Sequence, residues 1–277
     1  NHSHRWRMVS FRRATFINEN CMNQIEQYLE KSRAICDTIA SQKNEIETAA
    51  QWFTETILQG RMVHVFGSGH SRIMVEEMWP RYGSFPGFNP IVELSLTFHN
   101  LVVGANGQRQ AMFLENVSGL AERILRNFTI TEQDSALIIS SGGTNIVPIE
   151  MAEILQRKGI KVVSIVSKKH SAASVSKRSD GKKLGDCSDL VLDTGAPVGD
   201  SMVHIEGLNT PVAPGSSLGG VLLINCIKAR VAALLTAAGH PPIVLSAANV
   251  VGQEEAVRLF ESAYDEHAVR LSKLYQF

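Results

Sequence analysis

The segment between residues 62 and 77 constrains the fold more than any other part of the chain, because its hydrophobic pattern changes twice. An apolar run at residues 62–66 ends in a turn of small residues, and amphipathic helical spacing follows it. This order predicts a buried strand, a tight turn and a helix, the unit from which parallel α/β sheets are built. The turn consists of Gly67, Ser68, Gly69, His70 and Ser71.

This first turn predicts an anion site for which phosphate is the natural ligand. Its backbone N–H groups lie at a helix start, where the helix dipole favours negative charge, and Ser68 and Ser71 add hydroxyl donors. It is neither a dinucleotide fingerprint nor a P-loop, because Arg72 stands where the third glycine belongs and no Gly-Lys-Ser/Thr follows. A turn that serves only helix packing has the same pattern, so the first turn alone leaves that alternative open.

A second strand, turn and helix occupies residues 135–159. Its strand, residues 136–139, is fully apolar, as a sheet buried on both faces requires. The turn that follows consists of Ser140, Ser141, Gly142, Gly143 and Thr144. A helix is expected from residue 144 or 145, and the next strand, residues 162–166, completes a right-handed βαβ unit.

The turns of successive strands are expected to meet in one crevice. The third strand also ends in polar residues, which include Ser167 and His170. Ligands of open α/β sheets bind at the carboxyl ends of the strands. Convergence of several serine-rich turns at this edge therefore favours a phosphate site over a purely structural role.

The remaining pattern divides the chain around this sheet. We expect a tail and helices in residues 1–60, the phosphate-binding domain in residues 61–240, and a helical segment in residues 241–277. Apolar spacing predicts helices at residues 16–59, 110–127, 216–238 and 254–275, and short strands at residues 91–94 and 190–192.

Composition excludes several classes of function. The chain has 277 residues with 27 basic and 27 acidic side chains, so no net charge attracts nucleic acid or a membrane surface. No secretory signal core is expected, and the cysteines, Cys21, Cys36, Cys187 and Cys226, form no C-x-x-C pair. We therefore expect a cytoplasmic protein with neither a disulfide framework nor a zinc site, and we expect no cofactor.

The two turns resemble those of the SIS (sugar isomerase) domain family, and the likeness runs from about residue 35 to residue 240. The resemblance implies a flavodoxin-like three-layer α/β/α fold with a five-stranded parallel sheet. It also implies phosphosugar binding in serine- and threonine-rich turns, and assembly as a homodimer or homotetramer. The family includes aldose–ketose and phosphoheptose isomerases, N-acetylmuramic acid 6-phosphate etherase, and sensors that only bind the sugar phosphate.

Two subgroups of that family share further motifs with the chain. An uncharacterised bacterial group is similar at residues 66–71, 89–91, 147–152 and 197–200, and the etherase is similar at Glu77 and residues 80–83. The family's usual turn carries a second serine where this chain has Gly142, so one phosphate-binding hydroxyl is missing. In the etherase the glutamate at the Glu77 position is catalytic, whereas the second catalytic glutamate falls at Ser118 here.

The resemblance makes Glu77 the first candidate for a general base and acid. Glu115 lies one helical turn from Ser118 and is the second candidate. His99, like His70 and His170, has a side chain that polarises a carbonyl or holds a metal, although their spacing fits no short zinc motif. Isomerisation is favoured, and ether cleavage, a sensor without turnover and a structural subunit remain alternatives.

Overall fold

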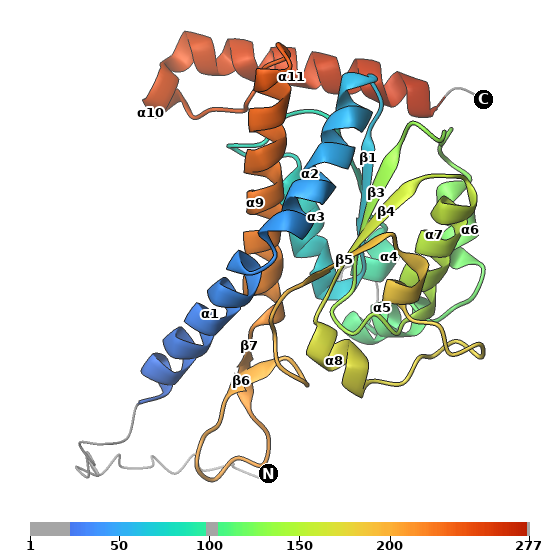
Figure 1. Cartoon of the computed structure of the whole chain (residues 1–277), viewed down its shortest axis with the longest axis vertical. Coiled ribbons are helices and arrows are strands. Elements are labelled where there is room, and N and C mark those ends of the chain that lie inside the picture. Colours follow the sequence, from blue (N-terminus) through green and yellow to red (C-terminus); the bar gives the residue numbers. More distant parts are fainter. Residues whose placement is uncertain (1–22, 98–104, 276–277) are drawn as a thin grey trace, which may run out of the picture.

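A five-stranded parallel sheet forms the centre of the molecule (Figure 1). The computed structural model describes residues 23–97 and 105–275. The strands are β1 (Val63–Gly67), β2 (Phe88–Ile91), β3 (Ser135–Ile139), β4 (Lys161–Val166) and β5 (Leu190–Asp193). Their spatial order, β2-β1-β3-β4-β5, is the flavodoxin-like order and confirms the predicted fold class.

Helices cover both faces of the sheet, because alternate residues of each strand enter different apolar clusters. Val65 and Leu137 pack with α2 (Lys43–Leu58), α3 (Arg72–Met78) and α9 (Ser216–Ala237). Phe66 and Ile138 pack with α6 (Leu120–Leu125) and α7 (Ile146–Arg157) on the opposite face. Burial on both faces explains why β1 and β3 are apolar without alternation.

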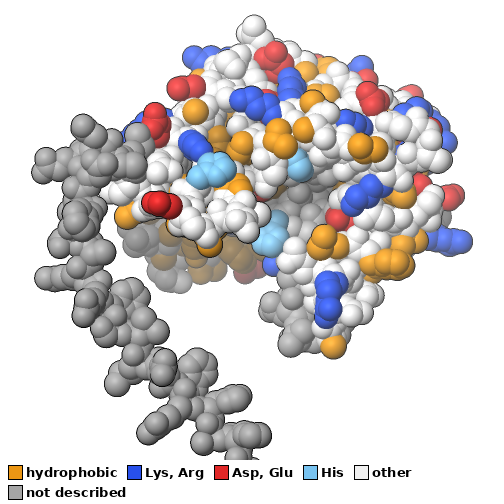
Figure 2. Space-filling model, turned by 90° about the horizontal axis from the view of Figure 1, so that it is seen from below, with side chains coloured by type: hydrophobic (Ala, Val, Ile, Leu, Met, Phe, Trp, Pro, Cys, Tyr) orange, Lys and Arg blue, Asp and Glu red, His pale blue; other side chains and the backbone are white. Residues whose placement is uncertain are grey.

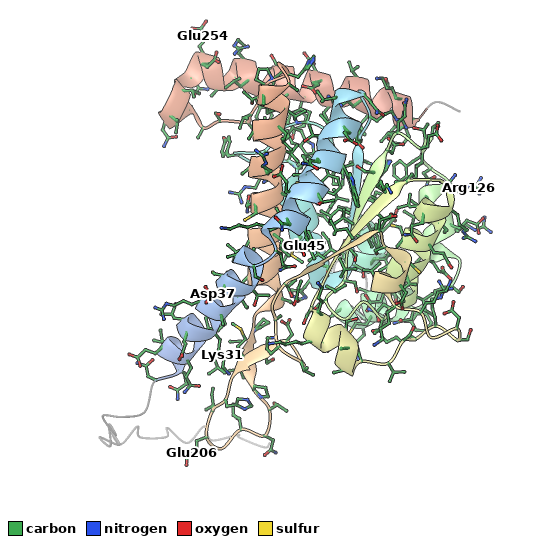
Figure 3. The ribbon with its side chains drawn as sticks, in the orientation of Figure 1. Lys31, Asp37, Glu45, Arg126, Glu206 and Glu254 are labelled. Carbon is green, nitrogen blue, oxygen red and sulfur yellow. The ribbon has the colours of Figure 1, made fainter. Side chains whose placement is uncertain are left out.

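Two elements project from the body of the molecule and support each other. Helix α1 (Gln24–Ala40) starts with an Asn23 capping box, and it runs beside the hairpin of β6 (Ser201–Val203) and β7 (Val212–Pro214) (Figure 1). The Tyr28 hydroxyl donates to the Pro214 carbonyl over 3.0 Å. The Lys31 ammonium donates to the Met202 carbonyl, and Glu206 lies in the loop at the hairpin tip (Figure 3).

A buried charge network joins the amino ends of β1 and β3. The Arg61 guanidinium holds the Asp134 carboxylate through two bonds, Nε–Oδ1 of 2.9 Å and Nη2–Oδ2 of 2.7 Å. The His64 ring lies beneath them, 3.7 Å from Asp134, and its Nδ1 accepts a bond of 3.0 Å from Asn89. The last long helix, α11 (Gln253–Leu274), closes this end through Arg270, which donates to the carbonyl of Arg61. The network therefore fixes the amino-terminal end of the strands, which is remote from the predicted phosphate turns.

Helix α9 is the one described helix that is long and apolar enough to span a membrane, with a mean hydropathy of 1.8 in its most apolar window. It packs against α1, α2 and α3, and its Gly219 and Gly220 face Thr194 and Met74. A core helix of an α/β protein meets the same criteria of length and composition.

The structure differs from the sequence prediction at several elements. The strand expected at residues 91–94 is β2, which starts earlier and contains Pro90, because an edge strand tolerates proline. The helix expected at residues 110–127 is α5 (Gln108–Leu114) and α6, separated by Gly119 with a φ of 84°. The β6–β7 hairpin and five short elements were not predicted; the short elements are η1 (Gly69–Ser71), α4 (Leu94–Thr97), α8 (Lys168–Ala173), η3 (Leu184–Cys187) and α10 (Ala248–Val251).

Candidate functional site

A cleft of about 540 Å³ lies at the carboxyl ends of β1, β3 and β4. Figure 2 shows this side of the molecule, where histidine side chains lie around a hollow. Most of the predicted binding residues line the cleft, namely Ser68, Gly69, His70, Ser71, Ser140, Ser141, Gly142 and His170. Glu115 lines it as well, so the structure brings a candidate base together with both serine turns.

The first turn holds the carboxylate of Glu115. Ser68 follows β1 in extended conformation, and its hydroxyl donates to Glu115 Oε2 over 2.8 Å. The backbone carbonyl of Glu115 accepts a bond of 2.9 Å from the Val147 N–H, which is one of the unpaired donors at the start of α7. Glu115 is thus fixed from both sides, by β1 through Ser68 and by α7 through Val147.

The surroundings of Glu115 favour its protonated form. Burial raises the pKa of Glu115 above its ordinary 4.5, and the bond from Ser68 and the charge of Lys177 offset only part of this effect. Lys177 is held near the cleft by a bond of 2.6 Å from its ammonium to Asn145 Oδ1. A carboxyl group with a raised pKa exchanges protons more readily near neutral pH than an ordinary glutamate does.

The second turn supplies one buried hydroxyl group that has no partner in the described part of the chain. Ser141 Oγ is buried at the cleft and makes no hydrogen bond there. Gly143 has a φ of 61°, a conformation that favours glycine, and its N–H closes the turn onto the Ser140 carbonyl over 3.1 Å. A buried hydroxyl without a partner costs free energy, and a ligand oxygen in the cleft would satisfy it.

His170 forms the wall beside the second turn. It lies on α8, whose N-cap Ser167 accepts a bond of 3.2 Å from the His170 N–H. On the ring, Nδ1 accepts a bond of 3.1 Å from the backbone N–H of Gly199. A side chain built at Gly142 would start 3.5 Å from His170 Nε2 and 3.5 Å from Thr144 Oγ1. Gly142 is therefore the point at which the turn and the ring come together.

The opposite wall of the cleft belongs to the start of α9. Asp200 has a φ of 66°, and its carboxylate accepts bonds from the Ser216 N–H and the Ser216 hydroxyl, both of 2.7 Å. The Gly215 N–H donates to the same carboxylate over 3.2 Å. A negative charge at a helix start is stabilised by the helix dipole. The Asp200 carboxylate therefore occupies the anion-binding position at the start of α9.

Four of the predicted binding residues support the cleft without lining it. Gly67 ends β1, and a side chain there would collide with the Ser71 carbonyl, 2.7 Å from its Cβ. Ser167 is fully buried and donates to the Ala196 carbonyl over 2.7 Å. Gly143 and Thr144, at the end of the second turn, are buried, and their carbonyls accept bonds from the N–H groups of Leu184 and Lys177. His99 lies outside the described residues.

The structure places Glu77 in a different cleft from the serine turns. This second cleft, of about 570 Å³, lies between α3 and α11, and its other lining residues include Ile73, Arg81, Tyr82 and Phe260. Burial raises the pKa of Glu77, but bonds from Asn225, of 2.8 Å, and from Arg81, of 2.5 Å, outweigh it and leave the pKa below 4.5. Within one chain, Glu77 is therefore ion-paired and separated from the predicted phosphate position.

The sequence prediction did not include several residues of the cleft. They come from segments far apart along the chain, and they are Met74, Gln108, Ala111, Met112, Asn145, Gly199, Asp200, Ser216 and Ser217. The motif at residues 197–200 is similar to the uncharacterised bacterial group, but this similarity does not indicate a position in the cleft. Among the described residues, no three His, Cys, Asp or Glu side chains are grouped as a metal site would require.

Comparison with known proteins identifies the family. The family model described as SIS domain matches residues 27–167, which is more than half of the chain. The chain belongs to the SIS-domain family. This match confirms the resemblance inferred from the two turns, and it spans both of them.

The SIS-domain protein has bacterial relatives of similar length. A UPF0309 protein of Halalkalibacterium halodurans is 32% identical over 223 residues, which cover 80% of this chain and 90% of that protein. A UPF0309 protein of Brucella anthropi is 34% identical over 216 residues, which cover 78% and 85%.

Solved structures with a similar fold are more distant. The phosphoheptose isomerase from Francisella tularensis is 16% identical, with 75% of this chain and 96% of that chain covered and a TM-score of 0.48. The Vibrio vulnificus NanR protein complexed with ManNAc-6P is 17% identical, with 88% and 69% covered and a TM-score of 0.40. The family assignment rests on the family model and the sequence relatives alone.

Proposed function

We propose that this SIS-domain protein binds a phosphorylated sugar and isomerises it by moving a proton between neighbouring carbons, as an aldose–ketose or phosphoheptose isomerase does. The observation that carries the proposal is the placement of Glu115, a half-buried carboxyl group with a raised pKa, between the two serine turns. The cleft volume of about 540 Å³ is within the usual range for small-molecule sites.

We place the phosphate group of the ligand at the second turn and the reacting sugar carbons next to the carboxyl group of Glu115. Ser140, the unpartnered Ser141 hydroxyl and the N–H groups of the turn are donors for phosphate oxygens. Ser68 and Ser71, in the first turn, are donors for further oxygens of the ligand. This arrangement leaves the acceptor oxygens of Glu115 facing the part of the sugar that carries no charge.

The proton transfer then needs one carboxylate. Ionised Glu115 removes the proton from the hydroxyl-bearing carbon next to the carbonyl, and the electron pair of that C–H bond forms the enediol double bond while the carbonyl oxygen gains the charge. The hydroxyl group of the deprotonated carbon then gives its proton to the former carbonyl oxygen, and the same carboxyl group returns the carbon-derived proton to the neighbouring carbon. The carbonyl thereby moves by one position. Because burial raises the pKa of Glu115, the ionised group is a stronger proton acceptor than an ordinary glutamate, and the protonated group can return the proton.

The test compares Glu115→Gln with Glu77→Gln, two identical changes at the two candidate bases. Deuterium incorporation from solvent into a panel of sugar phosphates measures the proton transfer, and calorimetry measures binding. We expect Glu115→Gln to retain binding and to lose about a hundredfold or more in exchange, whereas Glu77→Gln retains both. Loss of exchange in Glu77→Gln alone would transfer the role of base to Glu77.

Binding without exchange in the wild type would replace the isomerase by a sugar-phosphate sensor. Release of an ether substituent instead of exchange would favour the etherase-like lyase. That reaction uses a second carboxylate, and Ser118, which stands at its position, donates to Glu150 Oε1 over 2.5 Å.

The proposal includes a homodimer or homotetramer in the cytoplasm. On α1, Ile25 and Leu29 are 72% and 49% exposed, which leaves an apolar face that a second copy would cover. The described cysteines, Cys36, Cys187 and Cys226, are free thiols, which agrees with a reducing compartment.

A further inference from the structure

The ring of His170 is held in one tautomer by a backbone donor. The N–H of Gly199 points at Nδ1 from 3.1 Å, and a backbone N–H can only donate. Nδ1 must therefore present its lone pair, and in the neutral ring the proton resides on Nε2. The ring reaches the cleft as a hydrogen-bond donor, with its acceptor nitrogen turned away toward Gly199.

The donor nitrogen lies beside Gly142, a position of the second turn that has no side chain. This chain has Gly142 in place of the usual second serine, and His170 Nε2 is 3.5 Å from the position of the missing Cβ. Thr144 Oγ1 lies at the same distance from that position, and the unpartnered Ser141 Oγ precedes it in the turn. Two polar atoms, His170 Nε2 and Thr144 Oγ1, therefore lie beside the point from which a serine hydroxyl would extend.

We propose that His170 is a phosphate-binding residue which donates through Nε2–H as a neutral ring and replaces the hydroxyl absent at Gly142. The inference rests on the proposed function, since it assigns an additional donor to the same phosphate. A ring donor differs from a hydroxyl because it cannot accept, so the site offers a fixed donor to the phosphate oxygens.

The segment of residues 197–200 is the positioning element for this ring. Gly199 and Asp200 have φ values of 77° and 66°, two consecutive left-handed residues, which turn the Gly199 N–H toward α8. Asp200 anchors the segment on the other side through its bonds to Ser216 at the start of α9. The motif thus links the His170 tautomer to α9 and gives residues 197–200 a role that the proton-transfer chemistry does not require.

The first measurement is the tautomer itself, read from the nitrogen chemical shifts of the His170 ring in the free protein. The neutral ring is expected to carry its proton on Nε2, and Asp200→Asn, which weakens the anchor, is expected to increase the share of the other tautomer. A ring with its proton on Nδ1 in the wild type would overturn the proposal, whether or not any sugar phosphate is turned over.

The second measurement is the affinity for inorganic phosphate and for one sugar phosphate in two matched variants. His170→Gln places an amide donor near the position of Nε2, whereas the shorter His170→Asn places it near Nδ1. We expect His170→Gln to bind within about threefold of wild type and His170→Asn to bind about tenfold more weakly, as loss of a hydrogen bond to a charged group predicts.

A rescue variant separates this contact from a structural role of the ring. Gly142→Ser in a His170→Ala background supplies the hydroxyl that the family's turn normally carries, and we expect it to recover most of the lost affinity. Equal affinity in all variants, absence of rescue, or no phosphate binding by the wild type would each overturn the proposal. Deuterium exchange tests the isomerase activity independently. If the wild type exchanges deuterium while all variants bind phosphate equally well, the proposed function stands and only the role of His170 is refuted.

Discussion

The buried pair of Arg61 and Asp134 predicts a specific dependence of stability on pH. Burial raises the pKa of Asp134, but the neighbouring His64 ring, the Arg61 guanidinium and the Thr131 N–H together lower it from an ordinary 3.8 to about 2. Arg61 is the principal bonded partner, because its two bonds are below 3.0 Å and the His64 ring is 3.7 Å away. The Asp134 carboxyl group is thus ionised in the folded state at pH values where the same group is already protonated in the unfolded chain.

The size of the effect follows from the two pKa values. A carboxyl group whose pKa falls from 3.8 to about 2 on folding contributes about 2 kcal/mol to the free energy of unfolding at neutral pH. The sign is that of a depressed pKa, so the contribution is complete above about pH 5 and disappears as the pH falls through the folded-state value. Roughly half of it is lost at pH 3 and most of it at pH 2.

The assay is urea unfolding at several pH values between 7 and 2, with wild type and Asp134→Asn measured side by side. The variant is expected to lose about 3–5 kcal/mol at pH 7, because Arg61 keeps its charge without a carboxylate. The difference between the two proteins should narrow by about 2 kcal/mol as the pH falls to 2. Asp265→Asn, at an exposed position of α11, is the matched control and should follow wild type. A difference between wild type and Asp134→Asn that stays constant with pH would refute the reasoning.

Three further predictions concern the cleft, the core and the assembly. Ser68→Ala combined with Ser140→Ala is expected to weaken sugar-phosphate binding at least about tenfold in calorimetry while the melting temperature stays nearly unchanged. Gly219→Ala should destabilise the fold by several kcal/mol in urea unfolding, because the new Cβ would lie 2.0 Å from the Thr194 carbonyl oxygen. Gly220→Ala, whose Cβ meets only a flexible methionine side chain, should cost much less. Light scattering is expected to give at least twice the monomer mass of 30.4 kDa, and a monomer at micromolar concentration would contradict this.

The two serine turns could be predicted from the sequence because their determinants are local. The residues that end β1 and β3, the glycines that allow the turns and the first helical residues after them follow one another directly. The prediction of the two turns therefore needed no knowledge of long-range packing. The order of the strands was expected only from the resemblance to the SIS family, because the general rules for parallel α/β sheets allow more than one order.

Which of the two glutamates lines the cleft of the serine turns could not be predicted in the same way. Glu77 follows the first turn closely in sequence, but its side chain is turned toward Asn225 on α9, a contact between residues far apart in the chain. Glu115 enters the cleft because α5 ends there and Val147 of α7 binds its carbonyl. Similarly, the break before α6 depends on Glu150, which accepts a bond of 2.8 Å from the Gly119 N–H. Each of these outcomes depends on a partner that no local pattern identifies.

The position of Asp200 has a consequence for the kind of ligand that the cleft discriminates against. Its carboxylate is bound to the start of α9 and tethered by the chain, so it competes there at a high effective concentration against any dissolved anion. A sugar bisphosphate that fills the serine turns would gain nothing from α9 for its second phosphate, and it would meet the repulsion of a fixed negative charge. In the proposed phosphosugar site, the Asp200 carboxylate therefore disfavours a second anionic group at the start of α9. Ligands with a single anionic group and a neutral opposite end are favoured.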